Sequence, residues 1–93
     1  MTVLNTYDKQ PADVLDYDID YEDFLSPGDS VFFGTVSVSP AGLTIDSPMV
    51  VGKTLKLWVR GGTNGVTYKA DITMTTAQGR VKQDELRFRI KDI

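Results

Sequence analysis

Apolar and polar residues alternate along several short stretches of the chain, the pattern of a half-buried β-strand. In residues 16–21 each acid is followed by an apolar residue, which predicts a strand with Tyr17, Ile19 and Tyr21 facing the core. Residues 54–60, 68–75 and 86–91 alternate in the same way, with predicted inward positions at Leu55, Leu57, Val59, Tyr68, Ala70, Ile72, Met74, Leu86, Phe88 and Ile90. This period of two predicts an all-β protein.

Other segments alternate less regularly. Residues 30–38 predict a strand with a core face made of Phe32, Gly34, Val36 and Val38. Val31 and Phe33 then point outward, which indicates a bulge near Gly34 or an apolar contact surface. Residues 43–45 and 49–51 predict a short strand and a brief edge segment. Residues 82–85 interrupt the last strand, where we expect a bulge or a shift between sheets.

Turn signals rich in Gly, Pro and Asn separate these stretches at residues 26–29, 39–42, 61–65 and 77–79. Six or seven strands at a spacing of 8–14 residues predict an antiparallel β-sandwich. Phe24 and Leu25 are expected to close one end of its core. Residues 1–13 have little periodicity and predict an extended arm, because Pro11 biases its surroundings to open conformations. Residues 14–93 then form one domain.

Composition supports the same class and narrows the function. Val, Ile and Thr make up 25 of the 93 residues, and such β-branched side chains fit a pleated sheet better than a helix. The chain has no Cys and no His, which excludes disulfides, thiol nucleophiles, Ser-His-Asp triads and Cys or His metal sites. We therefore expect a binding or structural domain that is not an enzyme and needs no cofactor.

The net charge of −3 is the sum of two opposed blocks. Residues 1–30 hold eight acids against Lys9 alone, and residues 31–93 hold five acids against nine bases. The blocks attract each other either within one fold or between neighbouring copies. An acidic chain argues against a nucleic-acid partner. No signal peptide and no apolar run near the roughly 20 residues of a membrane helix is present, so we expect no membrane partner.

The acidic run is the first candidate site, with a carboxylate at every second position: Asp16, Asp18, Asp20 and Glu22. A calcium loop starting at Asp16 needs Gly and Glu where Tyr21 and Pro27 stand. Carboxylates on one strand face are also about 7 Å apart, too far to converge on one ion. The run is interpreted as a solvated face that discourages edge pairing, with a metal between subunits as the alternative.

Other motifs point to contact, not chemistry. The glycine-rich loop 61–65 lacks the Lys-Ser/Thr ending of a phosphate-binding loop. No sequence pattern predicts two carboxylates side by side in a cleft, as the catalytic pair of a glycosidase must be. The stripe of Arg87, Arg89 and Lys91 is interpreted as a solvated face or a surface complementary to an acidic neighbour. Trp58 points outward, so it is either covered by another segment or an interface anchor.

The step from Gly65 to Tyr68 resembles the tyrosine corner of immunoglobulin-like and fibronectin-like domains, in which a core tyrosine returns its hydroxyl to nearby backbone. An ordinary core tyrosine is the alternative. Under either interpretation Tyr68 is structural.

Two blocks of sequence resemble a family of small phage proteins, the fibre–tail adaptor-like proteins. The first block is residues 9–20 (KQPADVLDYDID), followed by Phe24 and Leu25. The second is residues 57–69 (LWVRGGTNGVTYK), continuing to residues 79–83 (GRVKQ). Members of the family often carry Trp where Phe24 stands, a change that keeps an aromatic plug.

The resemblance implies an immunoglobulin-like β-sandwich in the virion, made in the bacterial host cytoplasm, that joins tail or neck proteins to fibres or spikes. It implies no catalytic residue and no cofactor. A capsid cement or decoration protein is the alternative, and a carbohydrate-binding module is a third class, for which only a few exposed aromatics would serve. The candidate interface residues are Tyr7, Pro11, Phe33, Trp58, Arg87 and Arg89.

Beside the resemblance, the charge split suggests copies in a ring, with acidic first thirds against basic strands. The extended arm would add a strand to a neighbour. If the arm is separate, deletion of residues 1–12 leaves a folded domain.

Overall fold

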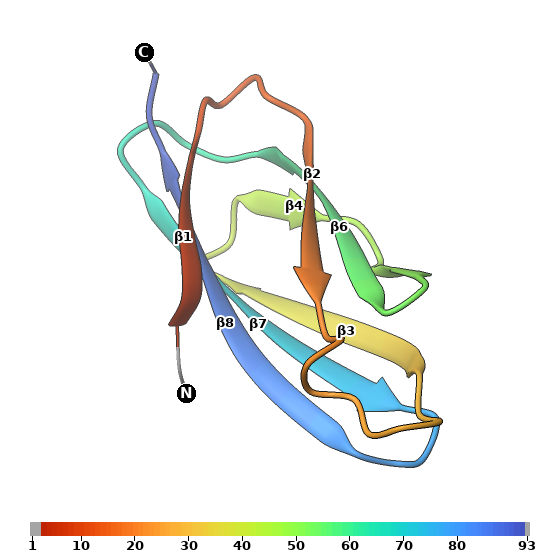
Figure 1. Cartoon of the computed structure of the whole chain (residues 1–93). Helices are drawn as coiled ribbons and strands as arrows, with labels where there is room; N and C mark the ends of the chain where they lie inside the picture. Colours follow the sequence, from red (N-terminus) through yellow and green to blue (C-terminus); the bar gives the residue numbers. More distant parts are fainter. Residues whose placement is uncertain (1–2, 93) are drawn as a thin grey trace.

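The computed structural model describes residues 3–92, which form two packed four-stranded β-sheets (Figure 1). Sheet A has the order β1 (Val3–Lys9), β8 (Val81–Ile90), β7 (Thr67–Thr76) and β3 (Val31–Ser39). In sheet B, β6 (Thr54–Gly61) pairs with β2 (Leu15–Asp20) on one edge and with β4 (Leu43–Ile45) and β5 (Met49–Val51) on the other. The described residues contain no helix, which confirms the all-β sandwich.

The strands with strict alternation enclose the core as predicted. Leu55, Leu57 and Val59 of β6 are fully buried between the sheets. The inward residues of β7 and of the second half of β8 face them: Tyr68, Ala70, Ile72, Met74, Leu86, Phe88 and Ile90. Phe24 and Leu25 pack against this cluster and close one end of it.

The N-terminal segment lies in the sandwich instead of forming a separate arm. Residues 3–9 are extended, as predicted, but they form β1, which pairs with β8 in parallel from Val3↔Glu85 to Lys9↔Ile90. The other strand pairs are antiparallel, so the expected set of about seven antiparallel strands becomes eight strands with one parallel pair. Residues 1, 2 and 93 of the predicted ranges lie outside the described residues.

Lys9 explains why β1 belongs to the domain. Its ammonium is buried and donates hydrogen bonds to the carbonyl oxygens of Gln10 (2.8 Å) and Gly61 (2.7 Å). Gly61 ends β6, so this side chain ties the end of sheet A to the end of sheet B. Burial lowers the pKa of Lys9, since the charged form loses its hydration.

The predicted break at residues 82–85 is absent. β8 pairs with β7 without a register shift from Val81 to Arg89, and its inward face includes Lys82 and Asp84. The two side chains form an ion pair at 3.3 Å, and Lys82 also lies over the ring of Phe24 (5.4 Å to the centroid). The alternation therefore continues, with a paired acid and base in place of apolar residues.

Candidate interaction surface

The two sides of the sandwich differ sharply in charge. The edge strands β1 and β2 carry Asp8, Lys9, Asp16, Asp18 and Asp20. On the opposite side, the strands β3 (VFFGTVSVS), β4 (LTI) and β5 (MVV) contain no charged residue. We call this opposite side, made of β3, β4 and β5, the uncharged side.

A bulge at the start of β3 turns two aromatic rings outward. Val31 pairs with Thr76 and Phe33 with Thr75, so the register shifts at Phe32. Val31 is buried, whereas Phe32 is 66% exposed and Phe33 46% exposed. Their rings meet edge to face with centroids 5.4 Å apart. The prediction that Phe32 faces the core is therefore wrong, and the predicted outward Phe33 is confirmed.

β5 and β6 add further apolar residues on the same side. Met49 lies opposite Lys56, and Val51 opposite Thr54, so both share the outer face of sheet B with Trp58. Met49 is 54% exposed, and Val50, Val51 and Trp58 are exposed as well. Trp58 is thus not covered by another described segment.

Gly34 lies where β3, the edge of sheet A, approaches sheet B. A Cβ atom at this position would lie 2.5 Å from Cδ2 of Leu55, so a larger residue would require the Leu55 side chain to move. Leu55 is opposite Val50, and β3 and β5 are in contact. We call the exposed apolar residues of these two edge strands, together with Trp58 of β6, the apolar patch: Phe32, Phe33, Met49, Val50, Val51 and Trp58.

Tyr7 and Pro11 lie elsewhere. The ring of Tyr7 packs on those of Tyr17 (4.5 Å between centroids) and Phe88 (5.6 Å), where β1, β2 and β8 meet. Pro11 is half-buried in the turn between β1 and β2. Tyr7 is thus part of the internal packing, and the structure does not place either residue near the apolar patch.

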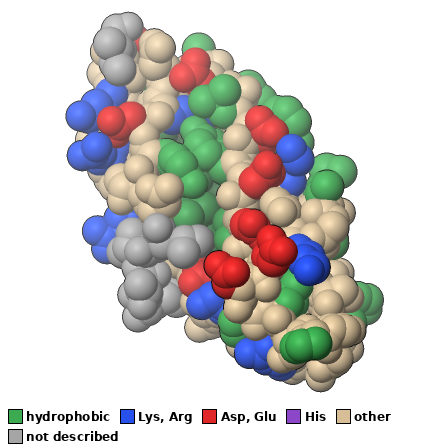
Figure 2. Space-filling model, viewed as in Figure 1, with side chains coloured by type: hydrophobic (Ala, Val, Ile, Leu, Met, Phe, Trp, Pro, Cys, Tyr) green, Lys and Arg blue, Asp and Glu red, His purple; other side chains and the backbone are tan. Residues whose placement is uncertain are grey.

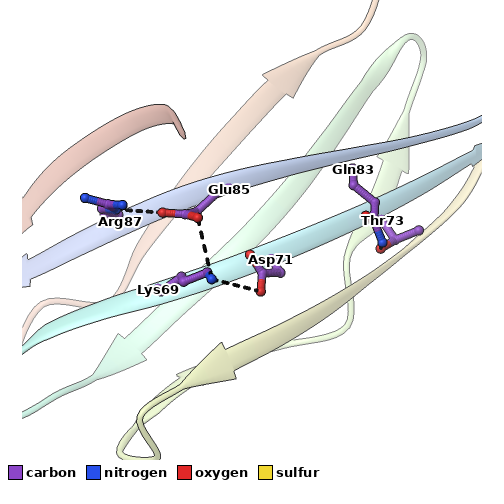
Figure 3. A network of polar contacts seen from close by, with 6 residues as sticks. All are labelled: Lys69, Asp71, Thr73, Gln83, Glu85 and Arg87. Carbon is purple, nitrogen blue, oxygen red and sulfur yellow. Dashed lines mark hydrogen bonds and ion pairs between the residues drawn. The ribbon is translucent and has the colours of Figure 1, made fainter. Parts of the chain in front are cut away.

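Arg87 and Arg89 form ion pairs on the outer face of sheet A. The Arg87 guanidinium donates to Glu85 at 2.6 Å, and Arg89 donates to Asp8 at 2.8 Å. Figure 3 shows that Glu85 also faces Lys69, which reaches Asp71 in turn. The bond from Arg87 holds the pKa of the Glu85 carboxyl below its usual value of 4.5.

This shift predicts a pH dependence of stability. Because folding depresses the pKa of Glu85, its contribution is complete above pH 4.5 and is lost as the pH falls through the lower, folded-state pKa. We expect Glu85→Gln to flatten the decline of the urea midpoint between pH 5 and pH 3. Glu22→Gln, outside the network, is the control, and equal slopes for the two variants would contradict the assignment.

Two of the three aspartates of β2 form ion pairs within the chain. Figure 2 shows acidic side chains along β2 and the segment after it, with basic side chains nearby. Lys56 lies 2.9 Å from Asp16 and 3.5 Å from Asp18, and its hydrogen bond lowers the pKa of Asp16. The two charge blocks therefore meet within one fold at this point, as they do where Asp8 meets Arg89.

The Gly65–Tyr68 step has a defined geometry. Tyr68 is buried, and its hydroxyl accepts a hydrogen bond from the backbone N–H of Thr63 at 3.0 Å. Gly65 has a φ of +87°, a conformation that favours glycine, and its N–H donates to the carbonyl of Ile90.

Two kinds of site, a pocket and a metal site, are absent from the described residues. Residues 3–92 enclose no pocket and contain no group of three or more acidic side chains placed to hold a metal ion. Within the same range, no helix is long and apolar enough to cross a membrane.

An all-β domain that exposes five large apolar residues on two uncharged strands, β3 and β5, has the features of a contact-forming, structural protein. The family described as podophage GP4 fiber-tail adaptor protein gp77 matches residues 9–89, and the chain belongs to this family. A comparison with curated proteins gave no match. The protein is therefore a fibre–tail adaptor of a podophage, a structural component of the virion tail and not an enzyme. The family places it in the tail, and not on the capsid as the alternative had it.

The sequence indicated two of the six residues in the apolar patch, Phe33 and Trp58. Phe32 was missed because the alternation counted back from Val38 was continued through the register shift between Val31 and Phe33, although a bulge near Gly34 was one of the two expected explanations. The run Met49–Val51 was recognised as an edge segment, and three apolar residues between Pro48 and Gly52 were the available signal for exposure.

Proposed function

We propose that the adaptor binds one of its structural partners, a tail, neck or fibre protein, through the apolar patch. The observation that carries this proposal is the position of five exposed large apolar residues on two adjacent strands that lack any charge: Phe32, Phe33, Met49, Val50 and Val51. Exposed apolar surface on a small domain is a typical mark of a protein contact, and aromatic residues often supply most of its binding energy. Phe33 and Trp58 keep their assignment as interface residues under this proposal.

The double variant Phe32→Ser/Phe33→Ser tests this contact. We expect the chain to stay folded, because both side chains are exposed, and its incorporation into tails to fall by roughly tenfold or more. The measurement is the amount of the chain and of fibre protein in purified virions after complementation of the deleted gene. Val14→Ser is the control, since Val14 is 58% exposed but lies directly before β2, away from β3 and β5. Normal incorporation of the double variant would contradict the proposal.

We further propose that several copies of the chain assemble in a ring around the tail. Support comes from exposed acids that follow the ion pairs of β2, namely Asp20, Glu22 and Asp23, and from the exposed base Lys53. Arg87 and Arg89 contribute less than the sequence suggested, because Glu85 and Asp8 already neutralise them. A tail reconstruction with a single copy of the chain would contradict the ring.

The finer fold assignment is also a proposal: an immunoglobulin-like sandwich. The order β3-β7-β8 corresponds to strands C, F and G of that fold, and β2-β6-β4 corresponds to B, E and D. Tyr68 stands near the start of β7, where the tyrosine corner is found, and its bond to Thr63 supports that role for Gly65 and Tyr68. An experimental structure with a different strand order would overturn the assignment.

A further inference from the structure

β3 is a long edge strand with one free side. Eight of its nine residues pair with β7 along one edge, and among the described residues no backbone hydrogen bond reaches its other edge from β4 or β5. The N–H and C=O groups on such an edge form a template for pairing with another extended chain.

The other edge strands are protected against pairing, whereas β3 is not. β1 and β2 carry charged residues, three of them aspartates at alternate positions of β2. β4 and β5 have three residues each, too few for a stable added strand. β3 has neither a charge nor a proline, two of the devices that block an edge, and its bulge is confined to its first residues.

The side chains of β3 leave its backbone accessible. From Phe33 to Ser39 the register with β7 is regular, so the bulge affects only the first residues of the strand. The exposed outer positions in this part are Thr35, Ser37 and Ser39. Their hydroxyls are small, and Ser and Thr make favourable cross-strand pairs with one another.

The exposure of Val50 indicates where an added strand would pack. Val50 lies opposite the buried Leu55, so its side chain points toward sheet A, yet it remains exposed. Sheet A ends at β3, which is in contact with β5. One more strand beside β3 would place apolar side chains against Val50, and its end would meet the Phe32–Phe33 ring pair.

We propose that β3 accepts an added β-strand from a tail or fibre protein. The donor is an uncharged, proline-free extended segment of about seven residues, the length of the regular part of β3, with an apolar residue at one end. This inference rests on the proposed function, because it assumes that the partner docks on the uncharged side. It adds main-chain pairing to the side-chain contacts of the apolar patch.

Ser37→Lys tests strand addition separately from the apolar patch. Ser37 is exposed and lies opposite Asp71, so a lysine fits the folded domain while adding charge to the edge. We expect an unchanged urea midpoint and a loss of roughly tenfold or more in incorporation into tails. Thr73→Lys is the matched control, because Thr73 is half-buried on β7 between Thr35 of β3 and Gln83 of β8, away from any edge.

Hydrogen exchange of the wild-type chain gives a direct measurement. In assembled tails, amides of residues 34–39 that do not bond to β7 are expected to exchange about a hundredfold more slowly than in the isolated chain. Unchanged exchange there overturns strand addition, and so does concentration-dependent protection in the isolated chain, which assigns the edge to a second copy. If Phe32→Ser/Phe33→Ser blocks incorporation but Ser37→Lys does not, this inference fails and the proposed function stands. If neither variant has an effect, both fail.

Discussion

Phe88→Ala is expected to lower the free energy of unfolding by about 3–5 kcal/mol, the range found for large aromatic residues in protein cores. Phe88 is fully buried, and its ring lies 5.1 Å from that of Tyr17 and 5.6 Å from that of Tyr7. These three rings join β1, β2 and β8, so the cavity left by the substitution opens between the sheets. Since a domain of this size is stabilised by only about 5–15 kcal/mol, the variant approaches global unfolding.

The measurement is urea denaturation followed by tryptophan fluorescence of Trp58. Phe33→Ala is the matched control, because it removes the same ring from an exposed position of β3 and is expected to cost less than about 1 kcal/mol. Equal losses for the two variants would show that Phe88 does not hold the sheets together.

Deletion of residues 1–9 is expected to prevent stable folding. The deletion removes the Tyr7 ring from the aromatic cluster and the Lys9 ammonium from the carbonyls of Gln10 and Gly61. It also converts β8 from a central strand to an edge strand. A separate arm, as the sequence first suggested, would leave the urea midpoint unchanged.

Rescue in trans makes this expectation specific to β1. A synthetic peptide of residues 1–9 should restore part of the folded circular-dichroism signal, because it supplies the missing strand, whereas a scrambled peptide should not. A truncated chain with the stability of the full chain would contradict the role of β1.

Strict alternation was a sufficient guide to β2, β6 and β7, because each has one face in the core and one in solvent. It failed in β8, where Lys82 and Asp84 face inward and form an ion pair. It also failed in β1, where an inward Lys9 conceals the pattern and the pairing partner lies near the other end of the chain. Local patterns contain no information on such distant partners.

The candidate surface was predictable only in part, for a related reason. Phe33 and Trp58 stand out as aromatic residues on the outward side of their strands. The proximity of β3, which carries Phe33, to β5, which carries Met49 and Val50, depends on the close approach of Gly34 to Leu55. These segments are far apart in sequence. The sequence shows that residues 31–39 carry no charge. This bears on binding only because β3 is an edge strand, and the sequence does not show that position.

The pairing of the first strand with the last also governs how the chain acquires its structure. Lys9 pairs with Ile90, so sheet A is completed only after the chain as far as Ile90 has left the ribosome. Contacts between such distant segments carry a large loop-closure cost, and all-β domains rich in them fold in about milliseconds to seconds. During that interval β8 lacks its outer neighbour β1, so both edges of sheet A, β8 and the uncharged β3, are unpaired. The newly made adaptor is thus most vulnerable to mispairing before its N-terminal strand has docked.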